Sequence, residues 1–178
     1  MTSPFSSSSN RVFLFLFVAG GLLWLGGNVV RSVVGFDVFY PGTLVFRAEQ
    51  TEAIRLNTIR MFAFTGAWTN WGFVAATIGS LGLMVGLRSL YRSKGWLLMA
   101  AILMALLIPS QGYLIWKDYE LLQYFDLQTG VPLAQPAEII RVFTERVTNI
   151  ANSMTAGLTM LAAVTIVIIL AFRPLHRQ

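Results

Sequence analysis

Long stretches of the chain carry no charged side chain. Three of them contain no Asp, Glu, Lys or Arg at all: residues 61–87, 95–116 and 147–172. A fourth stretch, residues 12–36, contains only Arg31. Because a helix needs about 20 apolar residues to cross the hydrocarbon core of a bilayer, this pattern predicts an all-α, polytopic membrane protein with four transmembrane helices. Their expected bounds are residues 12–35, 52–88, 95–117 and 137–172.

The second and fourth expected helices begin before their apolar spans. Charged residues at helical spacing, Glu52 with Arg55 and Glu138 with Arg141, lead directly into the apolar stretches. We therefore expect both helices to extend several turns beyond the hydrocarbon on the extracytoplasmic side. Their expected starts are residues 50–54 and 136–138.

The charges outside the apolar stretches predict the orientation. All eight acidic residues fall in the two longer segments between uncharged stretches, whereas the tight turn from Arg88 to Lys94 holds three basic residues and no acid. Since basic residues favour the cytoplasmic side, we expect this turn and both termini to be cytoplasmic. The first apolar run has no clear small-x-small cleavage site, which predicts a signal anchor. The expected location is the inner (plasma) membrane of a bacterium.

The composition fits one membrane domain. Of 178 residues, 56 % are hydrophobic and 12 % are charged, which predicts a single four-helix domain over residues 1–178. The chain has no Cys and one His, His176, so we predict no metal site. Basic residues outnumber acidic ones by 13 to 8. They lie at helix ends, where they anchor to headgroups, so nucleic acid is not an expected partner.

Polar residues gather near the extracytoplasmic ends of the expected helices. Such residues within a membrane often mark a functional site, here one that would bind an anionic headgroup or solute. The alternative is structural: Arg31 reaches the headgroups or pairs with an outer acid such as Glu145, and the amides tie the helices together. The candidate ligand-binding residues are Asn28, Arg31, Gln111, Asn149 and Asn152.

Small residues recur at helical spacing on the second helix, and Thr residues do so on the fourth. Small residues let helix backbones approach closely, which favours helix association in lipid. This face fits either packing within the chain or packing against another protein. The candidate interface residues are Gly72, Gly79, Gly82, Gly86, Thr155 and Thr159.

The sequence contains no catalytic motif. Phosphate-binding glycine loops, a Gly-x-Ser-x-Gly turn and paired intramembrane aspartates are missing. We therefore expect a non-catalytic accessory subunit that packs against other transmembrane chains in a larger membrane complex, as a hetero- or homo-oligomer. The alternative is a lipid- or small-anion-binding protein, or a permease component, that uses the polar cluster around Arg31. No cofactor is predicted, and a quinone, pigment or lipid held by packing alone stays open.

Overall fold

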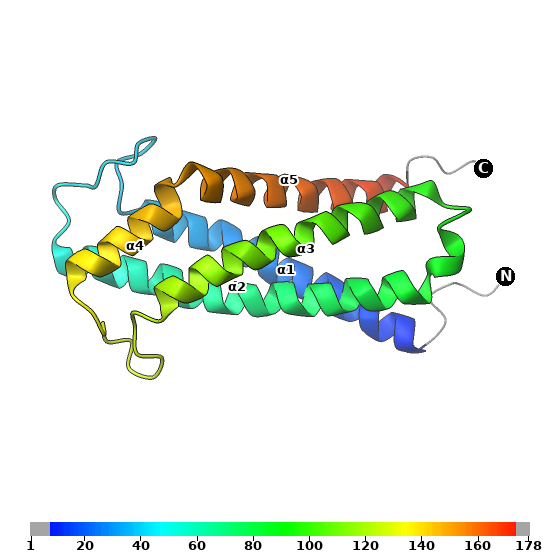
Figure 1. The fold of residues 1–178 in the computed structure, drawn as a ribbon, viewed down its shortest axis with the longest axis horizontal. Helices are drawn as coiled ribbons and strands as arrows, with labels where there is room; N and C mark the ends of the chain where they lie inside the picture. The colour runs from blue at the N-terminus through cyan, green and yellow to red at the C-terminus, as the bar shows by residue number, and fades with distance from the viewer. Residues whose placement is uncertain (1–7, 174–178) are drawn as a thin grey trace.

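The computed structural model describes residues 8–173, which form a long helical bundle (Figure 1). Helix accounts for 79 % of these residues and none of them forms a strand, so the all-α prediction is confirmed. The expectations that concern the two chain ends and His176 lie outside the described residues. The elements are α1 (Ser8–Phe36), α2 (Glu52–Gly86), the short helix η1 (Arg88–Leu90), α3 (Gly95–Leu122), α4 (Pro136–Thr148) and α5 (Ile150–Phe172).

Three of these helices, α1, α3 and α5, are long and apolar enough to cross a membrane. The structure is therefore that of a membrane protein with three clear candidate spans rather than four. The α2 helix has 35 residues, but polar positions such as Thr69 and Asn70 make it less apolar than the others. A fourth span on α2 stays a prediction.

The bundle has two distinct ends. The start of α1, η1 and the end of α5 lie at one end, which we name the turn end (Figure 1). The two longer connections, residues 37–51 and 123–135, lie at the opposite end, the loop end, together with α4. Both α2 and α4 begin where the charge pattern predicted. Thr51 caps α2 by accepting a hydrogen bond from the Ile54 N–H, and Pro136 occupies the first turn of α4.

The fourth expected helix must be corrected to two helices, because the chain leaves helical geometry at Asn149. This residue has a ψ of 124°, and its side chain accepts hydrogen bonds from the N–H groups of Ala151 and Asn152. It therefore caps a new helix, α5, as Asn commonly does. The Ser153 hydroxyl donates to the Val147 carbonyl at 2.8 Å, which satisfies one acceptor at the break. The helices α4 and α5 consequently meet at a bend (Figure 1).

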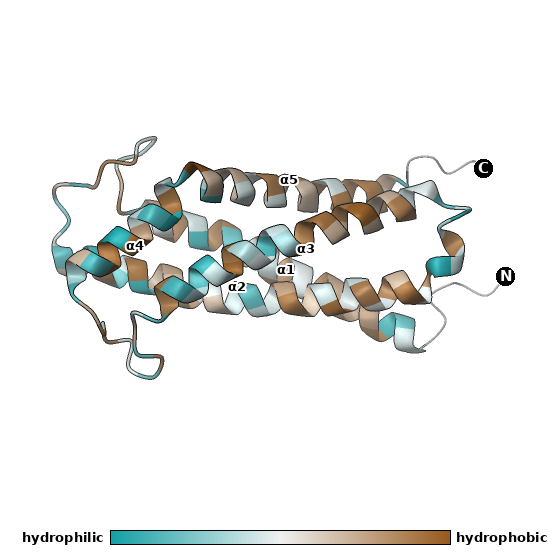
Figure 2. Cartoon of the chain, in the orientation of Figure 1, coloured by the Kyte–Doolittle hydropathy of each residue, from teal (hydrophilic) through white to brown (hydrophobic). Residues whose placement is uncertain are grey.

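The interior contains two separate hydrophobic cores. The core at the loop end is aromatic, with Phe39 and Phe143 fully buried and the ring of Phe62 edge-on to Phe143 at 5.2 Å between centroids. The second core surrounds Trp24 and Phe73 and is nearer the turn end. Figure 2 shows hydrophilic residues concentrated toward the loop end and hydrophobic residues along the rest of the bundle. The loop end thus has its own hydrophobic core, separate from that of the rest of the bundle.

The glycine face of α2 packs against α1 within the same chain. A Cβ atom on Gly72 would lie 2.9 Å from the Trp24 backbone nitrogen, and one on Gly79 would collide with the Phe17 backbone. Gly82 lies against the Phe13 ring and Gly86 against the Asn10 side chain. Of the two alternatives for this face, the structure therefore shows packing within the chain.

The two candidate interface threonines lie on α5 and donate hydrogen bonds to carbonyls of their own helix. Thr155 is half-buried and donates to the Ala151 carbonyl at 2.7 Å, and buried Thr159 donates to the Ala156 carbonyl at 2.9 Å.

Contact between α1 and α2 predicts opposite effects for two glycines of α1. A Cβ on Gly20 would lie 2.5 Å from the Ala76 nitrogen and 2.6 Å from the Gly72 carbonyl oxygen, whereas one on Gly26 would meet nothing within 4 Å. We expect Gly20→Ala to lower the free energy of unfolding by about 1–3 kcal/mol through overpacking. Gly26→Ala should leave it unchanged or raise it by helix propensity. Equilibrium unfolding in detergent measures both, and equal effects would contradict this packing.

Candidate functional site

Arg31 is buried in the bundle instead of reaching its surface. Its exposed fraction is 3 %, and its guanidinium carbon lies 3.9 Å from the centroid of the Phe62 ring. The Nε group donates to the Phe62 carbonyl at 3.1 Å. Gly66 provides the space, because a Cβ there would lie 2.9 Å from the guanidinium carbon. The α2 helix therefore binds the cation through the Phe62 ring and the Phe62 carbonyl, and the absence of a side chain at Gly66 leaves room for it.

Asp118 of α3 binds two arginines at once. One carboxylate oxygen lies 2.6 Å from Nη1 of Arg31 and the other lies 2.8 Å from Nε of Arg146. The exposed fraction of the side chain is 2 % for Asp118, 4 % for Arg31 and 11 % for Arg146. This arginine cluster, as we name these three residues, joins α1, α3 and α4 between the two hydrophobic cores. Nη2 of Arg31 is also buried and has no hydrogen-bond partner among the described residues.

Other carboxylates near the cluster are paired elsewhere. Glu138 and Glu145 both pair with Arg141, at 2.7 and 3.4 Å, and the hydrogen bonds from Arg141 lower the pKa of Glu138. Glu120 pairs with Lys117 at 2.9 Å. Within the part of the chain that the structure describes, no second carboxylate pairs with an arginine of the cluster. Two guanidinium groups share one carboxylate, so the cluster has a formal charge of +1.

A cavity of about 250 Å³ with a mixed polar and apolar lining lies beside the cluster, between α1, α3 and α5. We name it the polar cavity after its polar residues. Because a water molecule occupies about 30 Å³ in the liquid, the space can hold a group the size of a phosphate or carboxylate with some water. Guanidinium and amide groups line it, and both can donate hydrogen bonds. The hydroxyls of Ser32 and Thr159 already donate to carbonyls of their own helices. The polar lining residues of the cavity are Asn28, Arg31, Ser32, Gln111, Arg146 and Thr159.

The structure brings together three of the five candidate ligand-binding residues. Asn28, Arg31 and Gln111 line the polar cavity. Asn149 caps α5 instead, and Asn152, only 2 % exposed, accepts a hydrogen bond from the Tyr113 hydroxyl at 2.9 Å. Arg31 does pair with an acid, as the structural interpretation expected, but with Asp118 and not with Glu145. It therefore satisfies both alternatives, since it is structurally paired and also lines the cavity.

Sequence reasoning missed Asp118 and Arg146. Both lie in polar segments expected outside the membrane, where charges are common and none stands out as a partner for Arg31. One signal was available: Asp118 lies seven residues after Gln111, which places both side chains on one face of α3. A buried cation also requires a counterion. Together these two facts make Asp118 a candidate partner, which the three-dimensional pairing then distinguishes from the other acids.

Two exposed tryptophans, on α2 and α3, are close in sequence to residues at the cluster. Trp68 lies two residues from Gly66 and is 70 % exposed, and Trp116 lies two residues from Asp118 and is 60 % exposed. Trp is enriched where membrane and water meet. In a membrane, these rings would therefore place the arginine cluster near the headgroups.

No protein-family model, curated protein or solved structure matches the chain. The described residues also contain no group of three His, Cys, Asp or Glu side chains arranged to hold a metal ion. The fold and site define the protein as a helical membrane protein with a cationic cavity.

The shared carboxylate should be the most sensitive polar group in the structure. Asp118→Asn leaves two buried guanidinium groups without a counterion, so we expect the free energy of unfolding to fall by about 3–5 kcal/mol. Glu120→Gln, which removes an exposed carboxylate two residues away, should cost less than about 1 kcal/mol. Unfolding in detergent compares the two variants. A similar small effect for both would show that the cluster is not a buried ion pair in solution.

Proposed function

We propose that this protein binds an anionic group of a membrane ligand in the polar cavity beside the arginine cluster. The observation that carries the proposal is the excess positive charge of that cluster, which faces a cavity lined by further hydrogen-bond donors. Arginine suits this role because its planar, permanently charged fork donates to carboxylate and phosphate oxygens.

The chemistry of the cavity fits binding better than catalysis. Among the described residues, no carboxylate lines it, and both oxygens of Asp118, which pairs with the two lining arginines, are already bonded to arginine. A carboxylate held in this way is a poor general base. The expectation that the protein is not an enzyme is retained as part of the proposal.

We also propose that α2 crosses the membrane beside α1, with the loop end outside a bacterial inner membrane and the turn end in the cytoplasm. The support is that α2 contacts α1 from Phe13, near the turn end, to Arg31, near the loop end. If α1 crosses, α2 must cross with it. The three basic residues between Arg88 and Lys94 favour the cytoplasm for the turn end.

A second candidate function is that of a subunit in a larger membrane complex. The observation that favours it is the set of large apolar side chains exposed on the connections at the loop end, beyond the helices. Such side chains are common where proteins associate. They are Leu44, Val45, Leu127, Val131 and Leu133.

The anion-binding proposal predicts a specific effect of Arg146. Arg146→Gln removes the excess charge while Asp118 keeps its pair with Arg31, so the fold should survive. We expect affinity for phosphatidylglycerol, which is anionic, to fall at least about tenfold through loss of a charged hydrogen bond. Affinity for zwitterionic phosphatidylcholine should change little. Native mass spectrometry of the purified protein measures both.

Arg141→Gln is the matched control for Arg146→Gln. It removes a cation from the same helix, but one that is exposed and already paired with Glu138 and Glu145. Equal losses in the two variants would indicate binding to the general surface charge, and would overturn the proposed site.

The orientation is tested by labelling single cysteines, since the chain has none of its own. Thr43→Cys and Thr129→Cys, in the two longer connections, should react with a membrane-impermeant maleimide from outside. Ser93→Cys should react only after the membrane is opened. Labelling of Thr43→Cys from the same side as Ser93→Cys would show that α2 does not cross.

A further inference from the structure

An apolar groove lies beside the polar cavity, on the side of the turn end. A second cavity, of about 250 Å³, has one wall from α1 and one from α5, with α3 between them. Trp24 lines both this cavity and the polar one. The second cavity is almost entirely apolar, and its lining includes Phe17, Gly21, Met104 and Ile166.

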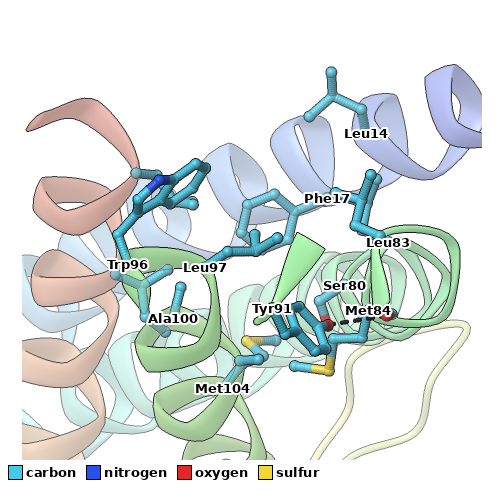
Figure 3. A pocket seen from close by; sticks show the side chains of 14 residues that line it. Leu14, Phe17, Ser80, Leu83, Met84, Tyr91, Trp96, Leu97, Ala100 and Met104 are labelled. Carbon is cyan, nitrogen blue, oxygen red and sulfur yellow. Dashed lines mark hydrogen bonds between the residues drawn. The ribbon is translucent and has the colours of Figure 1, made fainter. Parts of the chain in front are cut away.

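A third cavity, of about 110 Å³, extends the groove to the turn end. It shares Phe17, Met104, Ile166 and Leu170 with the second cavity, so the two are adjacent. Figure 3 shows its lining, with Phe17 of α1 and Trp96 and Met104 of α3 among the side chains around the space. The only hydrogen bond drawn there is from the Tyr91 hydroxyl to the Met84 carbonyl, at 2.9 Å.

The three cavities together match an amphiphilic ligand, because polar residues line the end near the arginine cluster and apolar residues line the rest. Along α1 they run from Ser32 to Leu14, which is about 27 Å at 1.5 Å per residue. One leaflet of a bilayer has a hydrocarbon thickness of about 15 Å, half of the core. The groove is therefore long enough for a lipid chain with its headgroup in the polar cavity.

The groove is too narrow for a helix of a partner protein. A helix with side chains is about 10 Å wide, and cavities of about 250 and 110 Å³ cannot hold several turns of one.

Trp24 marks the level at which polarity changes. Its indole Nε1 is buried without a hydrogen-bond partner among the described residues.

We infer that the ligand of the polar cavity is an anionic lipid, with its headgroup at the arginine cluster and one acyl chain in the groove between α1 and α5. This inference rests on the proposed function and adds the class of ligand. Charge complementarity selects the headgroup, and the apolar lining binds the chain through the hydrophobic effect.

Two glycines of α1 make a matched test of the chain's position. A Cβ on Gly21 or on Gly26 would meet nothing within 4 Å, but only Gly21 lines the groove. Gly21→Leu should therefore fill the groove without disturbing the fold. Gly26→Leu should leave both the groove and the fold unchanged. By native mass spectrometry, we expect Gly21→Leu to weaken phosphatidylglycerol binding about tenfold, as displacement of about two methylene groups would. Gly26→Leu should bind as the wild type does.

Glycerol phosphate, which carries the anion without a chain, separates this inference from the proposed function. If it binds as tightly as phosphatidylglycerol, and Gly21→Leu behaves as Gly26→Leu, the cavity takes a free anion and the acyl-chain inference is overturned. If Gly21→Leu weakens phosphatidylglycerol and phosphatidylcholine equally while Arg146→Gln weakens neither, the groove binds chains without selecting charge, and the proposed function fails.

Fluorescence quenching supplies a second readout if Gly21→Leu does not fold. Trp68, Trp71 and Trp116 are exposed and can be replaced by Phe, which leaves Trp24 and Trp96, both lining the groove. Phosphatidylglycerol with a brominated acyl chain should quench them saturably at low mole fraction in phosphatidylcholine vesicles. Quenching that only rises in proportion to bulk bromolipid would overturn the inference.

Discussion

The structure depends on one carboxylate that neutralises two buried guanidinium groups. Without Asp118, Arg31 and Arg146 would be uncompensated cations between two apolar cores, which is among the most unfavourable arrangements in a protein interior. Their pairing fixes three helices to one another at a single level: α1 through Arg31, α3 through Asp118 and α4 through Arg146. The break at Asn149 lies three residues after Arg146. The arginine therefore belongs to α4, and the apolar helix α5 begins after the break.

The groove is a consequence of how the helices pair. Glycines let α1 approach α2 closely, and α5 packs mainly on α3, so α1 and α5 form opposite walls with open space between them. The small residues that suggested a binding face for another protein thus act within the chain. Close packing on one side of α1 leaves its other side available for a ligand. The same helix contributes Arg31 and Asn28 to the polar cavity and Gly21 to the groove.

Much of the fold could be predicted from the sequence, because membrane helices are defined by long uncharged stretches. The early start of α2 and α4 was also predictable from charges at helical spacing. The break at Asn149 was not, since Asn within an apolar run fits both a buried helical position and a cap. The site was predictable only in part. Arg31, Asn28 and Gln111 are visible as polar residues in apolar stretches, but Asp118 and Arg146 lie among other charges, and only the three-dimensional pairing distinguishes them.

The central claim is that the arginine cluster and its cavity hold the anionic headgroup of a lipid. The most direct measurement is the position of the phosphate in an experimental structure of the protein bound to phosphatidylglycerol in a lipid nanodisc. Our account predicts the phosphate within hydrogen-bond distance of Arg31 or Arg146, with one chain passing Trp24 and Gly21 toward the turn end. A phosphate bound only at exposed bases such as Arg141, with the cavity empty of lipid, would contradict it.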